Sequence, residues 1–149
     1  MSETRQRVLD DIKTAMKAGD KPRLATLRLM SAAIKQKEVD ERIELTEPAV
    51  IAIFDRLLRQ RRESITQYSA AGRDDLVAQE QFEVDLIKRY LPAALSEAEI
   101  NDIVNAAVTE TSAASVKDMG RVMGLVKPKM QGRADMSIVS KMIRDRLNS

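Results

Sequence analysis

Residues 46–92 read TEPAVIAIFDRLLRQRRESITQYSAAGRDDLVAQEQFEVDLIKRYLP. Their apolar residues recur every three or four positions, which is the spacing of one face of an α-helix and not the alternation of a β-strand. Thr46 is a typical N-cap, and Gly72 is a natural C-terminal end. A second helix is expected from Asp74 to the residue before Pro92, because a proline pushes the residue that precedes it out of the helical region. The segment therefore predicts two consecutive helices joined by a short turn.

The same helical spacing continues on both sides of this pair. Before it, helices are expected at about 3–18 and 21–40, with Gly19 ending the first and Asp20 capping the second. After it, three more helices are expected to begin at capping residues, which are Ser96, Ser115 and Asp135. The sequence therefore predicts an all-α protein with about seven helices and no strand.

Pro92 marks the expected boundary between two helical parts. Residues 1–92 are predicted to form an N-terminal subdomain of about four helices, and residues 93–149 a smaller three-helix C-terminal subdomain. The sixth helix is expected to run from Ser115 across Pro128, where it is kinked or ends. One apolar stripe on each helix is expected to face the core; these stripes include Met16, Phe82, Val116 and Ile138.

The composition is that of a folded, helix-rich protein without the usual catalytic side chains. Of the 149 residues, 44% are hydrophobic and 32% are charged, and five Gly and four Pro are too few for a disordered tail. The absence of Cys excludes disulfides and thiolate nucleophiles, and the absence of His removes the commonest general base and nitrogen ligand. We therefore expect no catalytic residue, no metal site and no cofactor.

No targeting segment is visible in the sequence. The first residues, MSETRQRVLDDIK, are charged from Glu3 onward and lack the apolar run of a signal peptide. The longest apolar stretches, such as residues 49–54, are far shorter than the roughly 20 residues that a membrane span requires. These features predict a cytoplasmic protein with no membrane partner.

The strongest candidate site is a basic turn, KPKMQGRAD at residues 127–135. It contains a glycine and leads into the start of the last expected helix, where backbone N–H groups and the helix dipole favour a phosphate. Between Lys117 and Arg146 there are eight Lys and Arg against three Asp, in a chain whose net charge is +2. The residues predicted to bind RNA are Lys127, Lys129, Gly132, Arg133, Lys141 and Arg144.

The same residues also have a plain structural interpretation. Charge runs are usually solvated helix faces, Gly132 permits a tight turn, and Asp135 is an ordinary N-cap. The eight Met residues are interpreted as core filler, with a partner surface as a secondary possibility. Adjacent acids such as Asp10 and Asp11 point about 100° apart on a helix, so they do not share a catalytic or metal site.

A second basic group lies on the third expected helix and consists of Arg56, Arg59, Arg61 and Arg62. Its spacing distributes the side chains around much of the helix, so they cannot all form one patch. Pairing within the helix, such as Arg59 with Glu63, is the favoured explanation. Because only 3% of the residues are aromatic, an RNA partner is expected to be held by its backbone and shape and not by base stacking.

Several motifs resemble those of the YqeY-like family, small bacterial proteins of the GatB/YqeY superfamily. The motifs are RRESI at 61–65, AGRDDL at 71–76, KRYLP at 88–92 and LSEAEI at 95–100, supported by LRLMSAAIKQKEVD at 27–40 and MGRVMGLVKPKMQGRAD at 119–135. The resemblance covers essentially the whole chain. One departure is Met136, where the family often has a glycine or proline, and this affects the expected shape of the turn.

The resemblance implies a helical N-terminal part joined to a C-terminal part similar to the tail of the B subunit of the glutamine-dependent aminoacyl-tRNA amidotransferase. That tail contacts tRNA, while the chemistry happens elsewhere. Gly120, Gly132, Ala134 and Asp135 match the pattern shared with the tail. Proteins of this family are often described as carbon–nitrogen ligases with glutamine as amido donor. We interpret this description as inherited from the complete amidotransferase.

Three classes of function follow. The first is a tRNA-binding accessory protein that is linked to glutamine-dependent aminoacyl-tRNA amidation and is not catalytic alone. The second is a protein-interaction module that docks on an amidotransferase or aminoacyl-tRNA synthetase component. An enzyme is the weakest alternative, because it would need a perturbed lysine or a pair of carboxylates, and no spacing suggests either.

Overall fold

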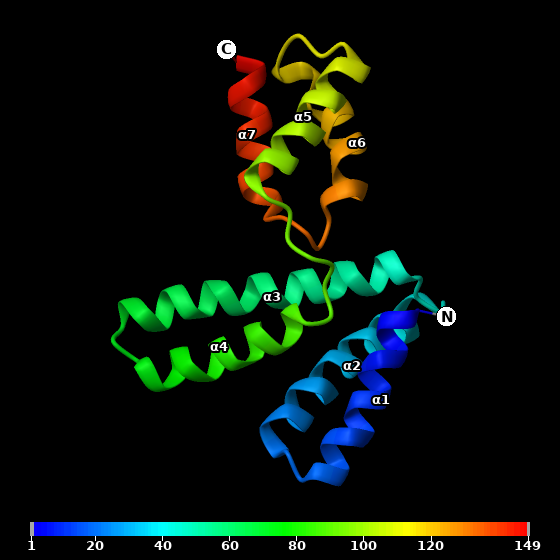
Figure 1. Ribbon diagram of the computed structural model, residues 1–149, viewed down its shortest axis with the longest axis vertical. Coiled ribbons are helices and arrows are strands. Elements are labelled where there is room, and N and C mark those ends of the chain that lie inside the picture. The colour runs from blue at the N-terminus through cyan, green and yellow to red at the C-terminus, as the bar shows by residue number, and fades with distance from the viewer. Residues whose placement is uncertain (1, 149) are drawn as a thin grey trace. The chain divides into compact units, whose positions relative to one another are not determined.

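The computed structural model describes residues 2–148, which form helices and contain no strand (Figure 1). Seven α-helices and one 3-10 helix follow one another along the chain. They are α1 (Glu3–Ala18), α2 (Lys21–Glu41), α3 (Glu47–Ala70), α4 (Asp74–Lys88), α5 (Glu97–Thr111), η1 (Val116–Asp118), α6 (Met119–Met130) and α7 (Met136–Asn148). The all-α prediction is therefore confirmed.

The described residues fall into two compact units that divide between Pro92 and Ala93. The first unit contains α1 to α4, and the second contains α5 to α7 with η1. Each unit has its own cluster of buried apolar side chains. Across residues 2–148, no helix combines the length and the apolar character that crossing a lipid bilayer requires.

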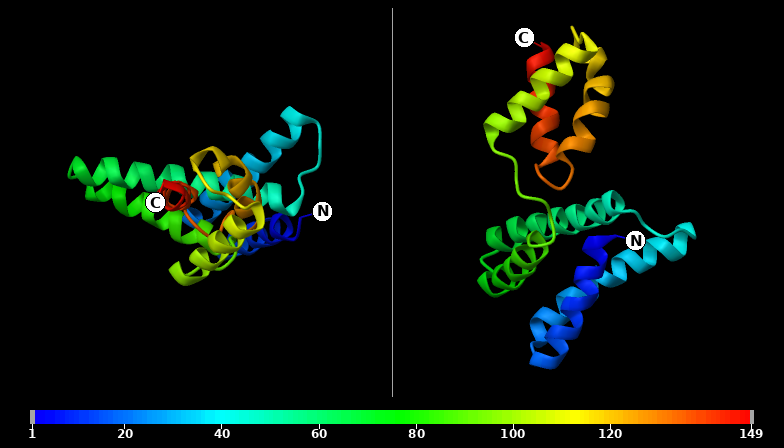
Figure 2. Two further views of the ribbon diagram at one scale, coloured as in Figure 1. Left: turned by 90° about the horizontal axis from the view of Figure 1, so that it is seen from above. Right: turned by 45° about the vertical axis from the view of Figure 1, so that its right-hand side comes forward.

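The first unit consists of two helix pairs, α1 with α2 and α3 with α4 (Figure 1 and Figure 2). Within each pair, a short turn joins two helices that lie side by side. The side chains of Asp20 and Thr46 accept backbone N–H groups at the starts of α2 and α3, as their positions in the sequence predicted. Gly19 adopts a left-handed φ of 68° after α1, which explains why a residue without Cβ stands there.

An aromatic pair lies in the core of the first unit. The completely buried ring of Phe54 meets the ring of Tyr90 edge to face, with 6.4 Å between the centroids. Tyr90 donates its hydroxyl group to the carboxylate of Asp11 on α1. Burial, together with Asp11, raises the pKa of Tyr90 to about 12, so the hydroxyl keeps its proton and remains a donor. The chain at the end of α4 is thereby fastened to α1.

Some residues expected to face the core are exposed. Met16, Phe82 and Ile138 are 54%, 43% and 59% exposed, so the prediction of their burial is wrong. Consecutive residues on a helix point about 100° apart. Ala15, next to Met16, and Val139, next to Ile138, are the residues that face the core. Phe82 lies instead on a face of α4 that is turned toward the start of α2.

The sixth helix begins later than the sequence predicted. The cap pattern at Ser115 starts the short helix η1, and α6 begins only at Met119. Val116, expected on the inner face, is therefore in η1 and is 38% exposed. Pro128 lies inside the last turn of α6, which ends at Met130.

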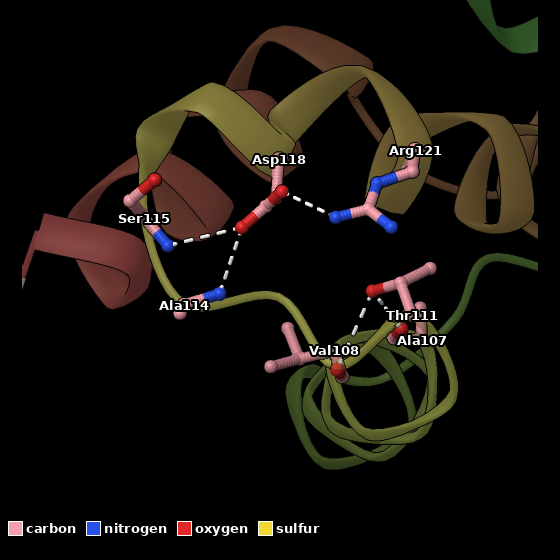
Figure 3. A network of polar contacts seen from close by, with 7 residues as sticks. All are labelled: Ala107, Val108, Thr111, Ala114, Ser115, Asp118 and Arg121. Carbon is pink, nitrogen blue, oxygen red and sulfur yellow. Dashed lines mark hydrogen bonds and ion pairs between the residues drawn. The ribbon is translucent and has the colours of Figure 1, made fainter.

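One carboxylate organises the chain around η1 (Figure 3). Asp118 accepts the backbone N–H groups of Ala114 and Ser115 at 2.9 and 3.3 Å and pairs with Arg121 of α6. The bond from Ala114 is the main reason that the pKa of Asp118 is lowered. Just before this turn, the Thr111 hydroxyl donates to the carbonyl of Ala107 at 2.8 Å (Figure 3). The loop between α5 and α6 is thus held by local polar contacts.

A second carboxylate fastens the start of α1 to the start of α3. Glu47 accepts hydrogen bonds from the Ser2 hydroxyl and from the Thr4 backbone N–H and hydroxyl, the last two at 3.0 and 2.7 Å. Ser2 and Thr4 are both buried. Burial raises the pKa of Glu47, but these hydrogen bonds outweigh it and bring the pKa below its ordinary 4.5. Glu47 therefore satisfies polar groups at a helix start that have no partner within their own helix.

We expect Glu47→Gln to lower the free energy of unfolding by about 1–2 kcal/mol at neutral pH, because hydrogen bonds to a charged acceptor are lost. The folded-state pKa of Glu47 is depressed, so its contribution is present above 4.5 and is lost as the pH falls through the lower folded-state value. Urea unfolding followed by far-UV circular dichroism measures the difference at each pH. The exposed Glu44 is the matched control, and an equal loss of stability for Glu44→Gln would contradict the assignment.

We propose that the two units are independent subdomains, and this predicts that residues 93–149 fold alone. Eight buried side chains form the core of the second unit, and domains of this size are near the lower limit for independent folding. A peptide of residues 93–149 is expected to be helical and to melt cooperatively by circular dichroism. A spectrum without helix would contradict the proposal.

Candidate nucleic-acid interface

The predicted basic turn, residues 127–135, consists of the last turn of α6 and the link to α7 in the second unit, at the orange-to-red end of the chain (Figure 1). Lys127 and Lys129 are exposed in the last turn of α6, on either side of Pro128. Lys141 and Arg144 are exposed on α7 and lie on one face, because they are three positions apart. We call residues 127–144 the basic segment.

Within residues 2–148, none of the four exposed cations of the basic segment takes part in a described ion pair. Arg121, outside this segment, pairs with Asp118. The opposite face of α7 is apolar, with Val139 and Ile143 completely buried in the core of the unit. The cationic side chains are therefore available to a ligand in solution.

The backbone of the turn is largely occupied by its own hydrogen bonds. The N–H groups of Arg133 and Ala134 both donate to the carbonyl of Met130, at 2.8 and 3.1 Å. Gly132 has a left-handed φ of 78°, which a residue without Cβ adopts most easily. The Asp135 carboxylate accepts the backbone N–H of Ser137 at 3.0 Å, at the start of α7. These groups close the turn, so the lysine side chains are the stronger candidates for contact with phosphate.

Arg133 takes a structural position within the basic segment. It is partly buried, and its Nε donates to the carbonyl of Ala93 at 3.1 Å. Its own carbonyl accepts the N–H of Leu95 at 2.8 Å. Arg133 therefore fastens the chain before α5 to the turn between α6 and α7. Lys127 and Lys129, in contrast, are exposed.

Charge is segregated along the second unit. The helix α5 carries four acids and no Lys or Arg; the acids are Glu97, Glu99, Asp102 and Glu110. Residues 116–148 carry eight Lys and Arg against three Asp. Four of the seven acids of the unit therefore lie on a helix without a cation, and all eight of its cations follow that helix in the chain.

The second basic group on α3 is dispersed, as its spacing predicted. Arg59 pairs with Asp55 at 3.6 Å and not with Glu63, so the expected partner is wrong although the pairing is within the helix. Arg61 reaches Glu83 of α4 at 3.4 Å and is nearly buried. Within residues 2–148, no cluster of three or more acidic side chains could hold a metal ion.

A family model described as "Yqey-like protein" matches residues 5–147 of this chain. The chain belongs to the YqeY family. The match includes both units and the whole basic segment, so the resemblance inferred from the motifs is confirmed.

The relatives of this YqeY-family chain include proteins named "Altered inheritance of mitochondria protein 41, mitochondrial". The one from Pyrenophora tritici-repentis is 32% identical over 143 residues, which are 93% of this chain and 78% of the relative. Those from Eremothecium gossypii and Lachancea thermotolerans are 45% and 40% identical over 84 and 104 residues, or 56% and 67% of this chain. These matches span 46% and 55% of the two relatives, about half of their length.

These relatives change one expectation about the YqeY family. They are eukaryotic, and their names place them in mitochondria, so the family is not confined to bacterial proteins.

Two features of the site were missed by sequence reasoning. The acids of α5 and the cations that follow are visible in the sequence, but their separation was not predicted, and the role of Arg133 depends on a contact 40 residues away.

The left-handed turn predicts opposite effects for two glycines. Gly132→Ala is expected to lower stability by about 1–2 kcal/mol, because Cβ opposes a positive φ. Gly124 lies inside α6, and a Cβ added there meets no atom within 4 Å. Gly124→Ala is therefore expected to raise stability by about 0.5–1 kcal/mol. Thermal unfolding followed by circular dichroism compares the two; a Gly132→Ala variant as stable as the wild type would rule out the described turn.

Proposed function

We propose that this YqeY-family chain binds tRNA through the basic segment of its second unit. The observation that carries the proposal is the distribution of charge: four exposed cations of the basic segment, Lys127, Lys129, Lys141 and Arg144, follow a helix, α5, that carries acids and no cation. A polyanion is attracted to the first surface and repelled by the second, so the unit has a defined orientation toward nucleic acid.

Lysine side chains at the end of α6 and in the middle of α7 suit a phosphate backbone. Each ammonium group is a point charge with three donors, and it contacts phosphate without reading a base. The second unit has no aromatic residue, so stacking cannot contribute there. Recognition is therefore of the backbone and shape of a folded RNA, as the similarity to the amidotransferase tail implies.

We further propose an accessory role in glutamine-dependent aminoacyl-tRNA amidation, in which the reaction occurs on a partner enzyme. The chain has no imidazole and no thiol, the groups on which general-base and nucleophilic chemistry near neutral pH most often depend. The proposal requires a compartment that contains tRNA, which holds for the cytoplasm and for the mitochondria named in the relatives.

The alternative, a module that docks on a synthetase or amidotransferase component, has less support from the second unit. Its methionines, expected to be core filler, were the secondary possibility for an adaptable partner surface. Met130 is completely buried, and Met119, Met123 and Met136 pack against the same core. The exposed charges of α6 and α7 are mainly cationic, which favours RNA.

Filter binding with bulk tRNA tests the proposal. We expect binding whose logarithmic affinity falls linearly with the logarithm of the salt concentration, because bound phosphates release counterions. The double variant Lys127→Ala, Lys129→Ala is expected to bind about tenfold more weakly and to reduce the salt slope by about two. Arg133 stays unchanged in this test, because it holds the turn together.

The matched control is the double variant Lys13→Ala, Lys17→Ala, which removes two exposed lysines one turn apart on α1. It is expected to bind tRNA like the wild type. Absence of binding at low salt, or equal losses for the two double variants, would refute the proposal. Capture of a synthetase or amidotransferase component that survives nuclease treatment would favour the docking module instead.

A further inference from the structure

A hollow of about 270 Å³ lies in the first unit, between the start of α2 and the C-terminal half of α4. Its lining residues are Asp20, Arg23, Phe82, Asp85, Leu86 and Arg89. Four of these residues, from Phe82 to Arg89, have the spacing i, i+3, i+4 and i+7, so they form one face at the end of α4. Leu86 belongs to the core together with Val84 and Ile87, so the lining face adjoins the buried face of the helix, and Phe82, Asp85 and Arg89 are its exposed part.

Phe82 gives the hollow an aromatic surface. It is 43% exposed, whereas Phe54, the other phenylalanine of the chain, is completely buried. A half-exposed ring in a concave site can stack on a planar ligand, and a base stacked on an aromatic side chain contributes substantially to binding. The low aromatic content argued against stacking as a general mode, but one well-placed ring is enough for one base.

Two arginines from different helices line the same hollow. Arg23 lies in the first turn of α2, close enough to the Tyr90 hydroxyl to act on its pKa. Arg89 follows α4, and its carbonyl accepts a hydrogen bond from the Arg7 guanidinium at 3.2 Å. That guanidinium also lies 5.0 Å from the centroid of the Tyr90 ring. The main chain that carries Arg89 is therefore fixed, while its side chain is exposed.

The acids of the hollow are already partly used. Asp20 accepts the backbone N–H of Arg23 at 3.3 Å, and Asp85 accepts the side-chain amide of Gln81 at 2.9 Å. A carboxylate has acceptor capacity for more than one donor, so both can take a further hydrogen bond.

The charges that line the hollow select its ligand. Two arginines and two aspartates sum to zero, so a simple anion gains little, because the carboxylates offset the attraction of the guanidinium groups. A ligand benefits from the whole lining only if it has an anionic group, a flat ring and N–H donors. A nucleotide with an amino-bearing base has all three.

We propose that this hollow binds a nucleoside monophosphate unit. The base stacks on Phe82, the phosphate is bound by Arg23 and Arg89, and the amino group of the base donates to one of the two aspartates. The unit is either a free nucleotide or an unpaired nucleotide of an RNA strand, since both present the same chemistry. The site belongs to the first unit and does not depend on tRNA binding by the basic segment.

Titration of the full-length chain with AMP, followed by amide shifts in two-dimensional NMR, tests the proposal. We expect saturable shifts at the residues of the hollow. Adenosine and inorganic phosphate, each of which lacks one part of the ligand, are expected to bind at least about tenfold more weakly. UMP, whose base has no amino group, is expected to bind more weakly than AMP and CMP.

Three variants separate the contacts. Arg89→Gln is expected to weaken AMP binding about tenfold, because a charge-assisted contact is lost. Phe82→Leu is expected to weaken it about fivefold, because an apolar side chain remains but stacking does not. Lys88→Gln is the matched control, since it removes the same charge next to Arg89 but outside the lining, and it is expected to have no effect. If Phe82→Leu does not fold, the comparison of Arg89→Gln with Lys88→Gln decides alone.

A short unstructured RNA oligonucleotide distinguishes the two sources of the ligand. It is tested on the Lys127→Ala, Lys129→Ala chain, so that the basic segment does not dominate the signal. Competition between the oligonucleotide and AMP identifies RNA as the source, and binding of AMP alone identifies the free nucleotide. The proposal is overturned if AMP gives no saturable shift, if phosphate or adenosine binds as tightly as AMP, or if Arg89→Gln matches Lys88→Gln.

Discussion

The second unit depends on one carbonyl oxygen, that of Met130, which accepts the N–H groups of both Arg133 and Ala134. This interaction ends α6 and reverses the chain through the left-handed Gly132. The side chain of Arg133 then ties the segment before α5 to the same turn. The reversal is also what brings the cations at the end of α6 to the start of α7. Stability and the candidate interface therefore depend on the same few backbone contacts.

The two units use charge in different ways. In residues 1–92, 17 Lys and Arg are nearly balanced by 16 Asp and Glu, and several form ion pairs or caps, such as Arg61 with Glu83 and Glu47 with the start of α1. In the second unit the net charge is equally small, but four of its seven acids lie on α5, which has no cation, and all eight cations follow that helix. A balanced total thus conceals a strong local field, and the distribution along the helices says more about partners than the net charge does.

Helix positions were predictable because the signals that set them are local. Thr46 and Ser96 accept hydrogen bonds from N–H groups three residues away, and Gly19 and Gly72 end their helices through their own φ angles. The residues that fix these helix ends are therefore neighbours in the sequence. Which face of a helix is buried was less predictable. Phe82 and Ile138 fit the apolar spacing, yet they are exposed, because other apolar residues of the same helices are buried in the core instead. Arg133 shows the same limit at the candidate site: its charge is local, but its partner Ala93 is not.

The placement of the aromatic rings has a practical consequence for spectroscopy. All four, including the Phe54–Tyr90 pair, lie in the first unit, and the chain has no tryptophan. Near-ultraviolet absorbance and intrinsic fluorescence therefore originate only from residues 54–90 of the first unit and report whether Tyr90 remains packed against α1. Loss of structure in α5 to α7 is silent to both techniques, so the two units can be monitored separately without any label.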